Sequence, residues 1–335
     1  MTSKPAVDEN HAATAGDKRK RVEHRAKPKE EPESAKDDDE EANEVKDEDV
    51  DQKVEDDEQP PAKAPKKTPS MGPLDWLLSD EAFDMANPEI PAGRGEIDLP
   101  EGTAGKPPPK DAGKRSSVSG DEPILRYPQS RLTPFQNLVA ACLLSKPISH
   151  KLGLRTIQTL LNPPFGLRTL DDLDEAGYEG RGKVMWEART QHKEKTAAQL
   201  GDVCAGVREL CGDRDSEEEL NNMAGIREQL EGLETGDATD KVVQLLTQVK
   251  GIGPGVAGIF LRRVQGDWSE VFPFADDRSL AAAKRLGLIK DGGDAEDLAK
   301  LVNGDRTKLV RLLDTLIGLD LEKKLDEAVA RVESS

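Results

Sequence analysis

The sequence is short of cysteine, of long apolar runs and of aromatic residues, and the first two shortages each exclude a class of protein. Only three of its 335 residues are cysteine, too few for a scaffold held together by disulfides. No apolar run approaches the roughly 20 residues that a membrane-spanning helix needs, and residues 1–30 have no apolar core of the secretory-signal kind. Aromatic residues make up 3% of the chain. We therefore expect a protein of a reducing compartment whose core is mainly aliphatic.

Charge is what the chain has in abundance, and most of it is acidic. It contains 48 Lys and Arg against 66 Asp and Glu, a formal net charge of −18. Residues 1–120 contribute 19 basic and 30 acidic side chains, and residues 121–335 contribute 29 and 36. The first 70 residues have too little apolar surface to offset the entropy of ordering a chain. We predict a disordered charged tail over 1–120 and a folded domain over 121–335.

Two short segments stand out within this tail. The basic run Lys18-Arg19-Lys20-Arg21 is typical of a nuclear localisation signal, so we expect the protein in the nucleus; a solvated charge run is the alternative. Residues 74–85 place their apolar side chains on one face of a short amphipathic helix. Such a short helix is marginal in water by itself. It must pack either on the protein's own domain or in the groove of a protein partner.

From about Pro123 onward, apolar residues recur at helical spacing and no stretch keeps the alternation of a strand. We therefore predict an all-α domain. Thr133 followed by Pro134, and Asp240 before an apolar face, are typical helix starts. Helices are predicted over 133–145, 149–161, 170–176, 182–211, 217–231, 240–250, 255–264, 278–288, 295–302, 306–319 and 321–332.

The most informative segment is a hairpin over 240–264, in which two helices meet at the turn Gly251-Ile252-Gly253. Backbone N–H groups between Gly251 and Gly255, together with the N-terminus of the second helix, would point outward and bind a phosphate oxygen. Glycine permits the close approach, and Ile252 should insert into the core. A plain connection whose glycines cap a helix is the simpler alternative.

Residues 253–258 also satisfy the pattern G-x-G-x-x-G, with Asp276 and Asp277 about twenty positions further on. This spacing is that of a dinucleotide-binding fingerprint. The fingerprint requires a preceding strand and a βαβ unit, whereas the segment before residue 253 has helical periodicity. The pattern therefore favours the hairpin over a nucleotide-binding fold.

A second element follows the hairpin. Residues 271–288 run from a short apolar stretch through Ala275-Asp276 into a helix that ends in Arg285-Leu286-Gly287. Together with Val249-Lys250-Gly251-Ile252-Gly253, this arrangement resembles the helix-hairpin-helix (HhH-GPD) DNA glycosylase superfamily, which includes endonuclease III. The resemblance is specific over 245–288 and loose over the rest of 125–320. It implies a two-lobed helical glycosylase fold, base-excision repair, and a monomer with double-stranded DNA as its partner.

The resemblance also implies roles for individual residues. Asp276, nine positions before Arg285, matches the family's catalytic aspartate, which would stabilise positive charge at the sugar C1′ and orient a water. Asp277 is then assigned as the cap of the following helix. The residues expected to contact DNA are Lys250, Gly251, Ile252, Gly253, Gly255, Arg262, Arg263 and Arg278.

Three departures from the family pattern refine these expectations. Gly255 stands where bifunctional members carry a Schiff-base lysine, which predicts a monofunctional glycosylase without lyase activity. The family's four-cysteine loop is absent, and Cys204 and Cys211 are interpreted as core thiols. We therefore expect no iron–sulfur cluster and no other metal ligands, although a monovalent cation at the hairpin is left open. Ser145-Lys146-Pro147 replaces the polar wedge, so no base-extruding residue is assigned.

The net charge of −7 over 121–335 weighs against DNA binding, because DNA-binding proteins usually present a basic face. Residues 241–290 carry more basic than acidic side chains, which favours modest, salt-sensitive binding there. Two alternatives stay open. One is a catalytically inactive scaffold of this fold whose acidic tail and 74–85 helix recruit partners. The other is a hairpin module that binds DNA without excising a base.

Overall fold

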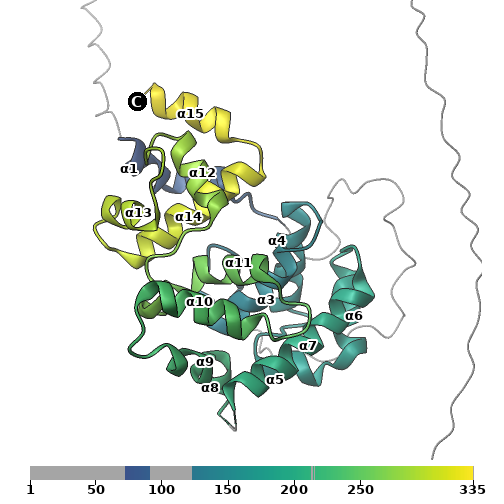
Figure 1. Cartoon of the computed structure of the whole chain (residues 1–335). Coiled ribbons are helices and arrows are strands. Elements are labelled where there is room, and N and C mark those ends of the chain that lie inside the picture. The colour runs from purple at the N-terminus through teal and green to yellow at the C-terminus, as the bar shows by residue number, and fades with distance from the viewer. Residues whose placement is uncertain (1–71, 91–122, 213, 215, 335) are drawn as a thin grey trace, which may run out of the picture. The chain divides into compact units, whose positions relative to one another are not determined.

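A computed structural model describes residues 72–90, 123–212, 214 and 216–334. Within these ranges the chain is helical and has no strand (Figure 1), which confirms the predicted all-α class. None of the helices in this part of the chain is long and apolar enough to cross a membrane. The predicted nuclear localisation signal, Lys18 to Arg21, and most of the predicted charged tail lie outside the described residues.

The described residues bury their apolar side chains in two clusters. The first cluster is formed by helices α3 to α11 together with Trp268 and the short helix η2. The helices are α3 (Pro134–Leu144), α4 (His150–Leu161), α5 (Leu170–Glu175), α6 (Gly177–Glu187), α7 (Lys193–Cys211), α8 (Glu217–Asn221), α9 (Ala224–Arg227), η1 (Glu228–Leu230), α10 (Thr235–Leu246), α11 (Pro254–Val264) and η2 (Ser269–Val271).

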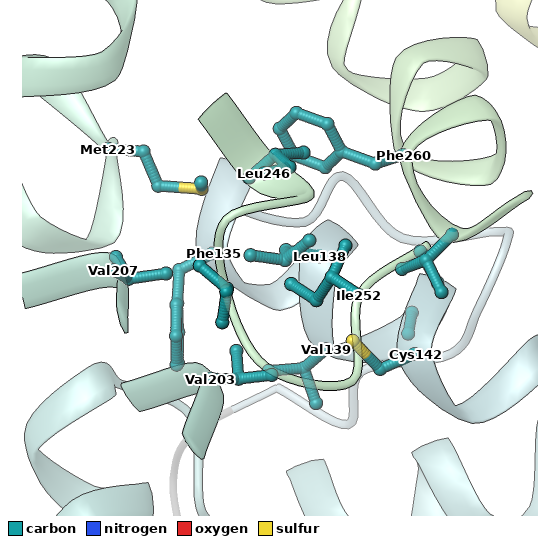
Figure 2. Packing of buried hydrophobic residues seen from close by; sticks show 14 of the residues in the cluster. Phe135, Leu138, Val139, Cys142, Val203, Val207, Met223, Leu246, Ile252 and Phe260 are labelled. Carbon is teal, nitrogen blue, oxygen red and sulfur yellow. The ribbon is translucent and has the colours of Figure 1, made fainter. Parts of the chain in front are cut away.

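Helix α3 is the centre of the first cluster, because its residues from Pro134 to Leu143 are all buried. Its start is a capping box: the Thr133 hydroxyl accepts from the Gln136 N–H, and the Gln136 side chain accepts from the Thr133 N–H. Helix α11 packs directly against α3. The core is mainly aliphatic, as expected from the composition (Figure 2).

The second cluster joins the two ends of the described chain. It combines α1 (Pro73–Leu77) and α2 (Asp80–Ala86) with α12 (Asp277–Arg285), α13 (Ala295–Leu301), α14 (Arg306–Leu321) and α15 (Leu325–Glu333). In Figure 1, α1 lies among these C-terminal helices. The segment around 74–85 therefore packs on the protein's own domain, which decides between the two alternatives that the sequence left open.

Contacts of α1 and α2 show why this segment belongs to the domain. Leu77 is completely buried, and Trp76 is nearly so. The Arg311 guanidinium lies 4.3 Å above the Phe83 ring and donates to the Leu78 carbonyl over 2.9 Å. A Cβ at Gly318 would stand 2.5 Å from the Ala86 carbonyl, so only glycine permits this approach of α2 to α14. The boundary predicted at residue 120 is therefore wrong, because residues 72–90 are part of the folded domain.

Several helix boundaries differ from the predicted ones. The helix predicted over 182–211 is two helices, α6 and α7, separated by a break in which Arg189 and His192 have positive φ angles. The helix predicted over 217–231 is interrupted at Met223, which has φ 51° and is fully buried. Helix α10 begins at Thr235 instead of Asp240. The apolar spacing along the chain does not reveal these breaks.

Candidate active site

The hairpin turn exposes its backbone as predicted. Gly253 is the N-cap of α11, and Gly251 has φ +87°. Ile252 is buried in the first cluster, where Figure 2 shows it with Leu138 and Cys142. This confirms its insertion into the core, and it leaves only the Ile252 backbone for any contact with DNA.

The backbone N–H groups of this turn are largely unoccupied. The Ile252 N–H donates to the Val249 carbonyl over 3.0 Å. No hydrogen bond to another described residue engages the N–H groups of Gly251, Gly253 or Gly255. Open space lies where a Cβ would stand at Gly253 and at Gly255. These donors, next to the N-terminus of an eleven-residue helix, suit an anionic oxygen.

The turn is fastened to α7. The Gln199 amide donates to the Gly251 carbonyl over 2.6 Å, and the Gln199 side-chain oxygen accepts from Lys146. Lys250 lies 3.1 Å from Asp202 and is 83% exposed. Lys146 follows α3, and its ammonium group holds the Gln199 side chain that bonds to this turn.

Asp276 is the N-cap of α12, which corrects the prediction that Asp277 has that role. Asp276 Oδ1 accepts from the Ser279 N–H over 2.9 Å and from the Ser279 hydroxyl over 2.7 Å. Its Oδ2 lies 3.2 Å from Arg262 Nη1. Asp277 is the first residue of the helix and is exposed. The cap and the arginine together fix the orientation of the Asp276 carboxylate.

The structure divides the four predicted DNA-contacting cations into two pairs. Arg262 is 10% exposed and is held by Asp276, while Arg263 is 9% exposed and forms an ion pair with Asp314. Burial, the largest effect, disfavours the charge of Arg263, but Asp314, Tyr127 and Asp267 together outweigh it and raise the pKa of the guanidinium. This burial argues against the direct phosphate contact that was predicted for Arg262 and Arg263. Lys250 and Arg278 keep exposed side chains, although Arg278 also pairs with Asp320.

A cavity of about 190 Å³ lies beside Asp276. Helices of both clusters line it, because α4 and α11 belong to the first cluster and α12 and α14 to the second. Its polar walls include Asp276, Arg262, Arg278 and His150, and its apolar walls include Ile259 and Ile317. The predicted catalytic residue therefore lies where two separately built parts of the core meet.

Sequence reasoning did not foresee a buried hydrogen bond between two side chains at this cavity. His150 Nδ1 lies 3.1 Å from Glu322 Oε1, and the two side chains are only 6% and 8% exposed. Burial lowers the pKa of His150, nearby Arg278 and Arg262 lower it further, and Glu322 partly opposes them. The two residues are 172 positions apart, so no local motif links them. In the sequence, the only indication of this contact was a histidine directly after a residue that caps a helix.

The cysteines are free and buried, which confirms Cys204 and Cys211 as core thiols. Burial raises the pKa of Cys142 and of Cys204 to about 12, so both stay protonated. Within the described ranges no group of three or more His, Cys, Asp or Glu side chains is placed to hold a metal ion. The expectation of a protein without a metal cofactor stays a prediction.

Comparison with known proteins finds no matching family model, no matching curated protein and no matching solved structure. The resemblance to the helix-hairpin-helix glycosylases therefore depends on the residues described above.

Proposed function

We propose that this chain is a monofunctional DNA glycosylase that hydrolyses the N-glycosidic bond of a damaged or mispaired base in double-stranded DNA. The observation that carries the proposal is the position of Asp276, an oriented carboxylate on the wall of a cavity between two parts of the core. The hairpin turn with its unoccupied N–H groups supports it. The protein would act as a monomer in the nucleus, without a metal cofactor.

Each part of the site has a chemical task in this reaction. The turn from Gly251 to Gly255 binds a backbone phosphate and so sets the register of the duplex without reading its sequence. The target nucleotide leaves the stack and its base enters the cavity. Asp276 then stabilises positive charge that develops at the sugar C1′ and orients a water for attack. Gly255 offers no amine, so the product is an intact abasic site.

Arg262 has a supporting task. Its guanidinium is held 3.2 Å from Asp276 Oδ2, where it keeps the carboxylate in one orientation. Because Arg262 is almost fully buried, it acts through Asp276 and does not reach the phosphate backbone. Lys250 and Arg278 are the exposed cations near the site that remain for contacts with DNA.

A second candidate function is a catalytically inactive member of the same fold that binds DNA or serves as a scaffold. The observation that favours it is the set of bonds to Asp276, since Ser279 occupies Oδ1 and Arg262 lies beside Oδ2. A carboxylate engaged at both oxygens is less available to a water. The net negative charge of 121–335 points the same way.

Excision assays separate the two functions. Duplex oligonucleotides that each carry one lesion, from a panel of deaminated, alkylated, oxidised and mispaired bases, are incubated with the full chain. We expect the release of one or a few bases, alkali-labile abasic product, and no covalent complex on borohydride treatment. Release of no base in the panel, with duplex binding intact, would favour the inactive scaffold, and a trapped complex would contradict the role of Gly255.

The variant pair Asp276→Asn and Asp277→Asn tests the catalytic assignment. Asparagine still caps a helix, so Asp276→Asn keeps the bond to Ser279 and removes only the charge. The buried Arg262 then lacks its partner, which costs about 1–3 kcal/mol of stability. We expect Asp276→Asn to lose excision by at least about a hundredfold and to keep binding DNA. Asp277→Asn, at the exposed neighbouring position, is the matched control and should stay active.

A further inference from the structure

The hydrogen bond between His150 and Glu322 positions an imidazole ring in the lining of the candidate cavity. His150 is the first residue of α4, and Glu322 is the C-cap residue of α14. His150 lines the cavity that contains Asp276. The ring therefore lines the same cavity as the proposed catalytic carboxylate, and it has no part in the mechanism described so far.

Glu322 determines which ring nitrogen carries hydrogen. A carboxylate accepts hydrogen bonds and cannot donate them, so the contact between Glu322 Oε1 and His150 Nδ1 requires Nδ1–H. The second carboxylate oxygen lies 3.4 Å from Lys151 Nζ. Burial and the two neighbouring arginines lower the pKa of His150, so the ring is neutral near pH 7 and its Nε2 carries a free lone pair.

Nε2 is the polar atom of the ring that remains available. No hydrogen bond joins it to another residue in the described part of the chain. The two arginines that line the cavity are already engaged, Arg262 with Asp276 and Arg278 with Asp320. A cavity of about 190 Å³ is smaller than the roughly 300–1,000 Å³ of typical ligand sites, so it suits one planar base and not a whole nucleotide.

We propose that His150 Nε2 is the acceptor that selects the base in this cavity, so that the site takes nucleobases with an N–H donor and rejects the same bases once that nitrogen is fully methylated. The inference rests on the proposed function to the extent that a base must enter the cavity. A site built around a buried acceptor discriminates strongly against a ligand that leaves it unpaired. Loss of one such bond weakens binding by roughly 5- to 150-fold.

Nitrogen-15 NMR of the histidines tests the proposal directly. The chain has only four histidines, so His150 can be assigned by its absence from the spectrum of His150→Leu. We expect the chemical shift of an unprotonated Nε2 and a protonated Nδ1. The probes are two matched pairs of bases: 1-methyluracil against 1,3-dimethyluracil, and 9-methyladenine against its N6,N6-dimethyl derivative. At least one donor-bearing base should shift Nε2, and its methylated partner should not.

Variants distinguish recognition from a purely structural clamp. His150→Gln keeps an acceptor near the position of Nε2, so the preference for the donor-bearing base should survive. His150→Leu removes the acceptor, so both members of a pair should bind alike. Lys151→Met is the matched control, because it removes a neighbouring charge without touching the ring, and it should keep the preference. If His150 only stabilised the fold through its bond to Glu322, the His150 variants would change in melting temperature and keep the same base preference.

The outcomes also separate this inference from the proposed function. Selective base binding without any excision would support the role of His150 and contradict the glycosylase. Excision with equal use of methylated and unmethylated bases would contradict the role of His150 alone. A protonated Nε2 in the free protein, or no response to any of the four bases, would overturn the inference.

Discussion

Replacing Leu77 by alanine measures how far the N-terminal segment 72–90 stabilises the domain. Leu77 is fully buried in the second cluster, on a helix that the sequence placed in a tail. A buried Leu→Ala change costs about 2–5 kcal/mol, through lost transfer free energy and the cavity left behind. For a domain of this size, 1 kcal/mol corresponds to about 2–4 °C. The melting temperature should therefore fall by about 4–20 °C.

The measurement is thermal unfolding of the full chain by circular dichroism. Asp84→Ala is the matched control, because Asp84 is an exposed residue of α2, and a change of less than about 0.5 kcal/mol is expected there. Two truncated chains extend the test. A chain that starts at residue 72 should melt like the full chain, since the sequence predicts disorder before that point.

A chain that starts at residue 91 should behave differently. It lacks four large buried side chains, namely Trp76, Leu77, Phe83 and Ile90. At roughly 1.5–3 kcal/mol each, they contribute about 6–12 kcal/mol, which is comparable with the whole stability of a typical domain. We expect the second cluster not to form. An unchanged melting temperature in Leu77→Ala, or equal melting of the two truncated chains, would refute the packing of α1 and α2.

Three further predictions follow from the site. In Gly253→Leu the new side chain meets open space at a negative φ angle, so the free energy of unfolding should fall by about 1 kcal/mol or less. DNA binding should weaken equally for all sequences. Unchanged binding in a filter or anisotropy assay would mean that the turn only connects two helices. Arg263→Met leaves Asp314 buried without its partner and should lower stability in denaturant by about 3–5 kcal/mol, while a selective loss of DNA affinity would restore Arg263 as a phosphate ligand. The pKa of His150 is lower in the folded than in the unfolded chain. Its contribution to the free energy of unfolding is therefore complete above about pH 6.5 and is lost as the pH falls, because the unfolded chain then binds the extra proton. In urea unfolding, the stability of His150→Gln should depend less on pH between about pH 5 and 6.5.

The candidate site illustrates how local signals succeed. The turn at Gly251 to Gly253 and the carboxylate at the start of α12 were both found from sequence, because each depends on neighbours within a few positions. Asp276 illustrates the limit of such signals. Two adjacent aspartates stand at the start of the helix, and the sequence pattern does not say which one caps it. The hydrogen bond from the Ser279 N–H assigns the cap to Asp276.

Arg262 and Arg263 show a second limit. Two adjacent arginines near a hairpin suggest phosphate contacts, because their charge is visible in the sequence and their burial is not. In the fold, each guanidinium meets a carboxylate from a distant helix or loop, Asp276 or Asp314. Partners so far apart along the chain leave no periodic signal.

The sequence by itself determined the helical class, most helices, and the glycine turn, because helical periodicity and glycine chemistry act over a few residues. Only the tertiary structure decided that 72–90 completes the second cluster. A short apolar helix face indicates that something must cover it, but it does not indicate which part of the protein does so. The tertiary structure likewise brought His150 to Glu322 and Asp276 to Arg262. Burial and ion pairing depend on which distant segments meet, and that is a property of the whole fold.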